Sequence, residues 1–146
     1  FAVPTLITYE ALARDGARLG LGADSVAKIA QVREAGLKSL AILKAAGVKM
    51  GFGTDLLGAS HDLQSEEFLI RAQVQSNLEV LQSATLIGAE LLNQVGVIGE
   101  IAAGARADLL LVDGNPLADL ACLTGQGERI PLVMQGGKLR VNELRA

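Results

Sequence analysis

Residues 48–55 have the sequence VKMGFGTD, a short apolar run that ends in Asp55. Upstream of it, residues 25–46 carry apolar side chains at helical spacing, which predicts a long amphipathic helix. A further apolar run, at residues 3–8, precedes that helix. We therefore predict strands at 3–8 and 48–53. Because the connection between them is long and helical, the pattern is that of a βαβ unit with parallel strands and a right-handed crossover.

Further helical signals lie on both sides of the second predicted strand. Ser76 and Glu79 have the spacing of a capping box, so a new helix should begin there. The other helical segments that we expect are a short helix at 10–19, a helix over 64–75 and a helical stretch over 83–92.

The last third of the chain changes to short apolar runs separated by glycine-rich turns, which predicts a β-rich and antiparallel region. The pair Gly136-Gly137 between the last two runs is a hairpin signal. We divide the chain into residues 1–95 and 96–146 on this basis. The predicted strands of the second part are 97–101, 107–112, 130–135 and 138–141.

The composition favours buried α/β packing and argues against several classes of protein. Half of the 146 residues are apolar and 3% are aromatic, so a core must be built from aliphatic side chains. The net charge is −3 without a basic stripe, which argues against nucleic-acid binding. No apolar run reaches the ~18 residues of a membrane span. The single cysteine, Cys122, has no basic neighbour in sequence, so we expect a buried thiol and a cytoplasmic protein.

Asp55 is the main candidate for function because of its predicted position. A carboxylate at the C-terminal end of a parallel strand lies where α/β folds place their chemistry. It could bind a metal, act as a general base or do both, but it could also cap the loop that follows. Glu66 and Glu67 are interpreted as a solvated start of a helix, favoured by the helix dipole.

Two further residues are candidates for substrate contact. His61, the only histidine, follows Asp55 in the same loop and could face the same pocket. Tyr9 ends the first predicted strand, on the same rim as Asp55 if the strands are parallel. The alternatives are that His61 is an ordinary loop residue and that Tyr9 only packs.

Four segments of the chain resemble the metal-dependent amidohydrolase superfamily. Residues 48–55 resemble its eighth barrel strand, and residues 3–6 its seventh. Residues 83–92 resemble the helix after the eighth strand, and 97–117 resemble the return into a small β-sandwich. The order and spacing agree over nearly the whole chain. Within the superfamily, the chain looks closest to the prolidase-like, or Xaa-Pro dipeptidase-like, branch.

The resemblance implies an α/β fold: the last two βα units of a TIM-type (β/α)8 barrel, followed by the C-terminal part of a small β-sandwich. It also implies that Asp55 is a metal ligand and a proton acceptor. The family's other ligands are histidines and a carboxylated lysine or glutamate on earlier strands, which this chain would lack. The implied cofactor is a divalent metal, zinc, in a binuclear site of the complete enzyme.

The function implied by the resemblance is hydrolysis of the amide bond of an Xaa-Pro-like dipeptide or an N-acyl amino acid by a metal-activated hydroxide. The chain would be a C-terminal portion of such an enzyme and inactive by itself. Two alternatives stay open: a catalytically inactive truncated fragment, and an assembly module that completes another chain. The expected partner is the missing N-terminal part of the enzyme or a second copy, and neither nucleic acid nor a membrane is expected.

Overall fold

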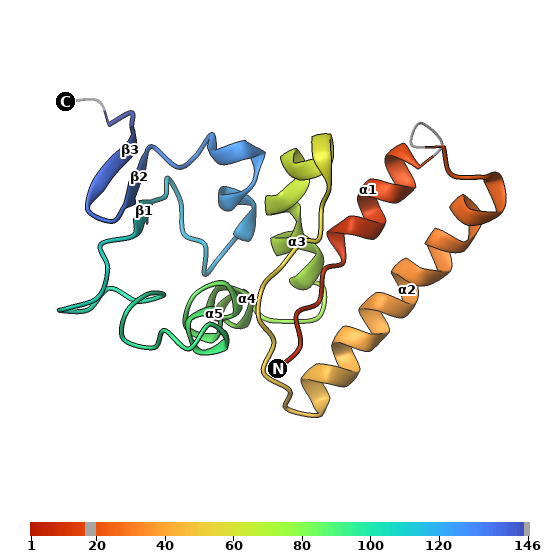
Figure 1. Ribbon diagram of the computed structural model, residues 1–146, viewed down its shortest axis with the longest axis horizontal. Helices are drawn as coiled ribbons and strands as arrows, with labels where there is room; N and C mark the ends of the chain where they lie inside the picture. The colour runs from red at the N-terminus through yellow and green to blue at the C-terminus, as the bar shows by residue number, and fades with distance from the viewer. Residues whose placement is uncertain (17–19, 145–146) are drawn as a thin grey trace.

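The computed structural model describes residues 1–16 and 20–144, as an arrangement of helices at one end and a small sheet at the other (Figure 1). Helices α1 and α2 lie side by side, α3 to α5 occupy the middle, and the strands lie beyond them. The elements, with η for a 3-10 helix, are α1 Ile7–Asp15, α2 Ala23–Ala45, η1 Gly58–Glu66, α3 Glu67–Arg71, α4 Asn77–Ala84, α5 Leu86–Leu91, β1 Leu109–Leu111, η2 Leu120–Leu123, η3 Gly125–Gly127, β2 Leu132–Gln135 and β3 Lys138–Asn142.

The two strands predicted for the first half reduce to one parallel bridge between Ala2 and Met50. The Ala2 N–H donates to the Lys49 carbonyl at 3.0 Å, and the Gly51 N–H donates to the Ala2 carbonyl at 2.9 Å. The parallel direction is confirmed, but the predicted extent of the first strand is wrong. Helix α1 already begins at Ile7, because a distant carboxylate accepts the N–H of that residue and caps the helix there.

The predicted long helix is confirmed as α2, and it ends where Gly47 adopts a positive φ of 67°. Among the side chains of α2 that the structure describes, Ile29 and Leu40 are buried, whereas Ile42 is 68% exposed. Within the described residues, no helix is long and apolar enough to cross a membrane. The short helix predicted at 10–19 is α1, which ends at Asp15; the part of that prediction at 17–19 lies outside the described residues.

The helix predicted over 64–75 is shorter than expected, because η1 takes up its beginning and α3 spans only five residues. The capping box at Ser76 is confirmed. The Glu79 N–H donates to Ser76 Oγ at 3.3 Å, and the Ser76 N–H donates to Glu79 Oε2 at 2.6 Å. Helix α4 therefore begins at the predicted place, and α5 lies within the expected helical stretch at 83–92.

The C-terminal sheet has the order β1-β2-β3, and both pairs are antiparallel. Gln135 pairs with Lys138 across Gly136-Gly137, so the predicted hairpin is confirmed. The strand predicted at 97–101 is wrong. The chain turns there instead: Gly99 has a φ of 82°, and a Cβ on it would lie 2.6 Å from the Thr85 carbonyl oxygen.

The buried apolar residues that the structure describes are few and spread along the chain, and in α4 and α5 they are Val80 and Ala89. Ile7, Ala11 and Leu56 form a buried cluster in the helical part, against which Leu63 and Ile70 pack. In the C-terminal part, Leu120, Cys122 and Leu132 are buried. The expected burial of Cys122 is confirmed, and its thiol lies 3.0 Å from the Asp119 carbonyl.

Candidate active site

The segment that leads to Asp55 passes close to the N-terminal segment and to α5. A Cβ on Gly51 would lie 2.9 Å from Leu91 Cδ2 of α5 and 3.5 Å from Val3 Cγ2, and one on Gly53 would lie 2.6 Å from Val3 Cγ1. Neither glycine has a positive φ, and a larger side chain at either position would require Leu91 or Val3 to shift. The two segments can therefore run together up to the residues that precede Asp55.

Asp55 lies just beyond this close approach, and its side chain is exposed. Its φ is 51°, a left-handed conformation that residues other than glycine adopt at a cost. The Thr8 hydroxyl, in the first turn of α1, donates to the Asp55 carbonyl at 3.2 Å. The backbone of Asp55 is therefore held from α1, while its carboxylate remains open to a ligand.

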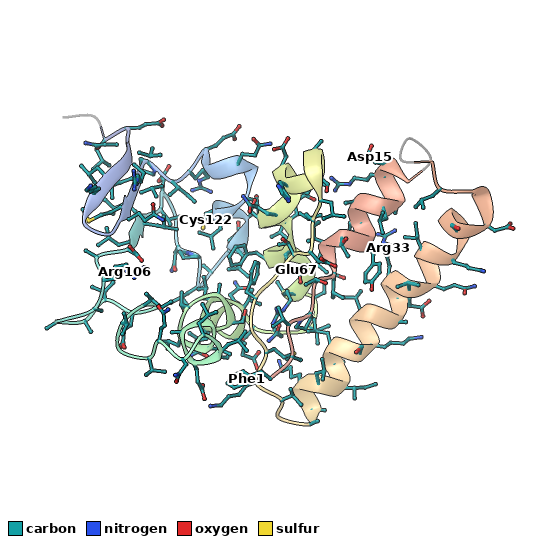
Figure 2. All side chains as sticks on the ribbon, in the orientation of Figure 1. Phe1, Asp15, Arg33, Glu67, Arg106 and Cys122 are labelled. Atoms are coloured by element: carbon teal, nitrogen blue, oxygen red, sulfur yellow. The ribbon has the colours of Figure 1, made fainter. Side chains whose placement is uncertain are left out.

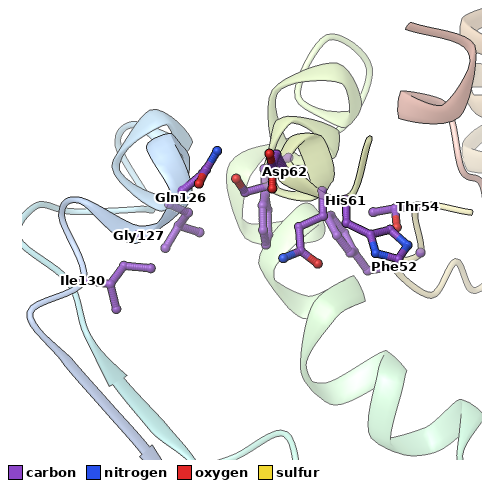
Figure 3. Close-up of a pocket in the computed structure, with 12 residues that line it drawn as sticks. Phe52, Thr54, His61, Asp62, Gln126, Gly127 and Ile130 are labelled. Carbon is purple, nitrogen blue, oxygen red and sulfur yellow. The ribbon is translucent and has the colours of Figure 1, made fainter. Parts of the chain in front are cut away.

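His61 lies on η1 and lines a hollow of about 690 Å³ between residues 52–68 and 123–130 (Figure 3). Its Nε2 is 2.7 Å from the Leu56 carbonyl, and a proton on Nε2 would leave Nδ1 free to accept a hydrogen bond. Phe52 and Thr54 lie on the same side of the hollow, opposite Gln126. His61 thus faces a space that is large enough for a small ligand.

Tyr9 lies elsewhere. It is in α1 and lines a second hollow, between residues 2–6 and α2. His61 and Tyr9 thus line different hollows, and Asp55 lines neither of them. The metal-binding and catalytic role of Asp55 and the substrate contacts of His61 and Tyr9 stay predictions.

Glu67 and Arg71 are two buried ionisable residues that the sequence did not reveal. Both side chains are 0% exposed, so the interpretation of Glu67 as part of a solvated helix start is wrong. Figure 2 shows Glu67 in the middle of the molecule, near the start of α1. Its Oε2 accepts the Ile7 N–H at 2.7 Å. The spacing of four residues on one helix face was the only local signal for a charge pair.

Arg71 connects α3 to the segment before Asp55. Its Nη1 donates to the Gly51 carbonyl at 2.9 Å, and its Nε donates to Gln75 Oε1 at 2.7 Å. The guanidinium also lies 5.8 Å from the centre of the Phe52 ring, which in turn packs against Phe68. Arg71 therefore holds the backbone and the aromatic side chain at the beginning of this segment.

Burial disfavours the charged forms of both members of the pair. It raises the pKa of Glu67 to about 7, although the Ile7 and Leu6 N–H groups and Arg71 pull in the opposite direction. Burial also lowers the pKa of Arg71, against the attraction of Glu67. Burying both side chains therefore costs free energy. Each of them also forms a hydrogen bond to the backbone of another segment, Glu67 to Ile7 and Arg71 to Gly51.

Among the described residues, no group of three His, Cys, Asp or Glu side chains comes together to hold a metal ion. The exposed carboxylate of Asp55 is a suitable ligand for a divalent cation, but a zinc site takes three or four protein ligands. The residues therefore fit a metal only as one contributor to a larger site.

Comparison with known proteins gives a consistent set of relatives. Residues 2–139 match the amidohydrolase family. A crystal structure of an amidohydrolase is 59% identical, with a TM-score of 0.92 over 98% of this chain. A prolidase complexed with N-methylphosphonate-L-proline is 53% identical, with a TM-score of 0.90 over 97% of this chain. A Xaa-Pro dipeptidase with methionine bound in its active site is 30% identical, with a TM-score of 0.81 over 96% of this chain.

The chain is short in comparison with these proteins. It spans 35% of the amidohydrolase and of the prolidase, and 34% of the Xaa-Pro dipeptidase. No curated protein matches the sequence. Since the family match extends over nearly all of the 146 residues, this chain belongs to the amidohydrolase family.

Proposed function

We propose that this chain forms the C-terminal part of a metal-dependent amidohydrolase that cleaves the amide bond of an Xaa-Pro-like dipeptide or an N-acyl amino acid. The observation that supports this most strongly is Asp55: an exposed carboxylate at the end of a segment bridged in parallel to residue 2. The similarity to a prolidase and a Xaa-Pro dipeptidase supports the choice of substrate. Within that fold, residues 1–95 would belong to a barrel and residues 96–146 to a sandwich.

In this proposal Asp55 is both a metal ligand and a proton carrier. A bound divalent metal, zinc in our proposal, would polarise the substrate carbonyl and make water acidic enough to attack it. Asp55 accepts the proton of the attacking water and passes it to the departing amine, as a general base and then a general acid. His61 and Tyr9 are proposed to contact the substrate, His61 from the rim of the 690 Å³ hollow.

The remaining ligands must come from outside these residues, so we propose that the chain works together with the preceding part of an amidohydrolase fold. The coverage of 35% of its relatives supports this partner. So does the surface: Phe1, Val3 and Ile42 are exposed apolar side chains around the N-terminal segment and α2. A second copy of the chain is the alternative occupant of that surface. The buried thiol of Cys122 is compatible with a cytoplasmic location, which stays a prediction.

The test is the substitution Asp55→Asn in the assembled protein, in which the chain is expressed with the remainder of the amidohydrolase fold. An amide cannot take up the proton, so hydrolysis of a panel of Xaa-Pro dipeptides and N-acyl amino acids should fall by at least a hundredfold. The circular dichroism spectrum should not change, because the side chain is exposed. Asp24→Asn, at an exposed carboxylate in the first turn of α2, is the matched control.

Three outcomes would contradict parts of the proposal. Near-normal turnover by Asp55→Asn would show that Asp55 is not the proton carrier. Metal-dependent turnover by the 146-residue chain alone would show that no partner is needed. A stable homodimer in light scattering, active without other protein, would replace the proposed partner by a second copy.

A further inference from the structure

Helix α1 lacks an N-terminal cap of its own. The residue at its N-cap position is Leu6, whose side chain has no polar atom to accept the free N–H groups of the first turn. Glu67 Oε2 takes this role from 60 positions away in the sequence, at 2.7 Å from the Ile7 nitrogen. A negative charge at this end of a helix is also favoured by the helix dipole. The start of α1 is therefore fixed by Glu67.

The next residue of α1 carries this constraint to Asp55. Thr8 follows Ile7 directly, and its hydroxyl donates to the Asp55 carbonyl at 3.2 Å. Asp55 has a left-handed backbone, a conformation that needs support from its surroundings in a residue with a Cβ. The hydrogen bond from Thr8 is one such support. It holds the backbone of Asp55, the residue whose side-chain direction matters in the proposed function.

Arg71 acts on the other end of the same segment. It lies one helical turn after Glu67 and donates to the Gly51 carbonyl at 2.9 Å. One short helix, α3, thus provides two buried polar side chains, one that binds Gly51 directly and one that is linked to Asp55 through α1. The contact to Gly51 is direct, whereas the contact to Asp55 passes through Ile7 and Thr8.

Glu67 and Arg71 are not explained by a contribution to folding stability alone. Within the described part of the chain, Glu67 Oε1 and Arg71 Nη2 are buried without a hydrogen-bond partner. Burial of charged side chains costs free energy, and buried atoms without a hydrogen-bond partner add to that cost. A role in fixing geometry accounts for both the burial and the backbone contacts.

We propose that Glu67 and Arg71 are positioning residues for Asp55, acting through Thr8 at one end of the segment 51–55 and through Gly51 at the other. The effect on catalysis rests on the proposed function of Asp55. The effect on the conformation of Asp55 does not, so the two can be tested separately.

The first test compares three variants at two threonines in the assembled protein. Thr8→Val removes the hydroxyl without changing the shape, and Thr8→Ser retains it. Loss of one hydrogen bond that orients Asp55 should lower kcat about fivefold, with KM within twofold of the original value. Thr8→Ser should restore kcat. Thr85→Val is the matched control, since the exposed Thr85 hydroxyl, at the C-terminal end of α4, donates to the Leu81 carbonyl of that helix.

The second test asks whether Glu67 and Thr8 act along one path. Glu67→Gln retains an oxygen acceptor for the Ile7 N–H but removes the charge. It should lower kcat by itself, and combining it with Thr8→Val should cost less than the product of the two separate losses. Losses that multiply, or a change confined to KM, would overturn the inference.

A measurement without turnover separates this inference from the proposed function. The carbonyl carbon resonance of Asp55 in the NMR spectrum reports the hydrogen bond from Thr8. It should shift in Thr8→Val and in Glu67→Gln, and should not shift in Thr8→Ser or Thr85→Val. If the unsubstituted protein hydrolyses nothing but these shifts occur, the proposed function fails and the positioning role stands. An unchanged resonance in Glu67→Gln would overturn the positioning role whatever the activity.

Discussion

The helical part, residues 1–92, and the sheet part, residues 109–142, are held together in different ways. In the helical part, charged side chains join segments that are far apart in the sequence. Besides the contacts of Glu67 and Arg71, these ion pairs are Arg14–Glu66, Arg33–Glu10, Lys44–Glu79 and Lys49–Glu90. In the sheet part, backbone pairing along β1, β2 and β3 provides the connection, and all five residues of β3 are exposed.

This difference indicates where single substitutions will matter. A backbone ladder does not depend on any one exposed side chain, so the sheet should tolerate most substitutions. The helical part depends on a few side chains, and the two that are buried reach the segment that carries Asp55. The candidate site thus lies in the more sensitive of the two parts.

The largest effect should come from Glu67→Ala. It removes the cap of α1, leaves the Ile7 N–H without its acceptor and opens a cavity in the interior, so the free energy of unfolding should fall by about 3–5 kcal/mol. Urea unfolding followed by circular dichroism measures it. The matched control is Glu34→Ala, which breaks the exposed pair with Lys38 and should leave the free energy of unfolding nearly unchanged. Equal effects of the two substitutions would contradict the expectation that the buried carboxylate matters more than the exposed one.

The next effect is a dependence of stability on pH that Glu67 should produce. Its pKa is about 7 in the folded chain, above the ordinary value of 4.5, so the folded chain holds the proton more tightly than the unfolded chain. Stability should therefore rise as the pH falls from about 7 to about 4.5, by up to about 3 kcal/mol from this group.

The variant Glu67→Gln isolates that contribution, because glutamine does not titrate. Chemical unfolding at several pH values should give a flatter profile for the variant over the same interval. A profile parallel to that of the unsubstituted chain would assign the pH dependence to other groups.

A smaller effect is expected at the turn that follows the helical part. Gly99→Ala would place a Cβ 2.6 Å from the Thr85 carbonyl oxygen, so the backbone must shift. Gly104→Ala is the matched control, because Gly104 also has a positive φ, of 90°, but no atom within 4 Å of the added Cβ. Both variants have the cost of the left-handed conformation, and Gly99→Ala should lose about 1–3 kcal/mol more. Thermal unfolding compares them, and equal losses would mean that contact with α4 and α5 plays no part.

The smallest effect concerns a local contact inside the helical part. Ser76→Ala removes the cap of α4, which should cost about 1 kcal/mol. Ser39→Ala, at an exposed position within α2, is the control and should be neutral or slightly stabilising. Unfolding curves for the two variants show whether a local cap contributes less than the long-range cap that Glu67 provides. A loss as large as that of Glu67→Ala would contradict this order.

Local signals explain which parts of the fold could be predicted from the sequence. The periodicity of α2, the capping box at Ser76 and the glycine pair of the hairpin each depend on neighbouring residues, and each is confirmed. The start of α1 could not be predicted, since a carboxylate 60 positions away decides it. The same is true of the turn at Gly99, which is shaped by its contact with Thr85.

In the candidate site, too, features that depend on neighbouring residues could be predicted and features that depend on distant contacts could not. Asp55 could be singled out because it ends an apolar run, which is a local feature. The burial of Glu67 and Arg71 could not be predicted, because two neighbouring glutamates and an arginine on a short helix also fit a solvated surface. Their contacts depend on how α3 packs against two distant segments.

The burial of Cys122 gives this protein a natural reporter of its own motions. The chain has no other cysteine, and this one is only 2% exposed in η2. A thiol reagent can reach it only when η2 opens, so the rate of labelling measures how often that part of the chain opens. Because η2 contacts α3, the helix that carries Glu67 and Arg71, the labelling rate should also respond when that helix is disturbed. Native thiol chemistry thus gives access to the dynamics around the candidate site without an engineered probe.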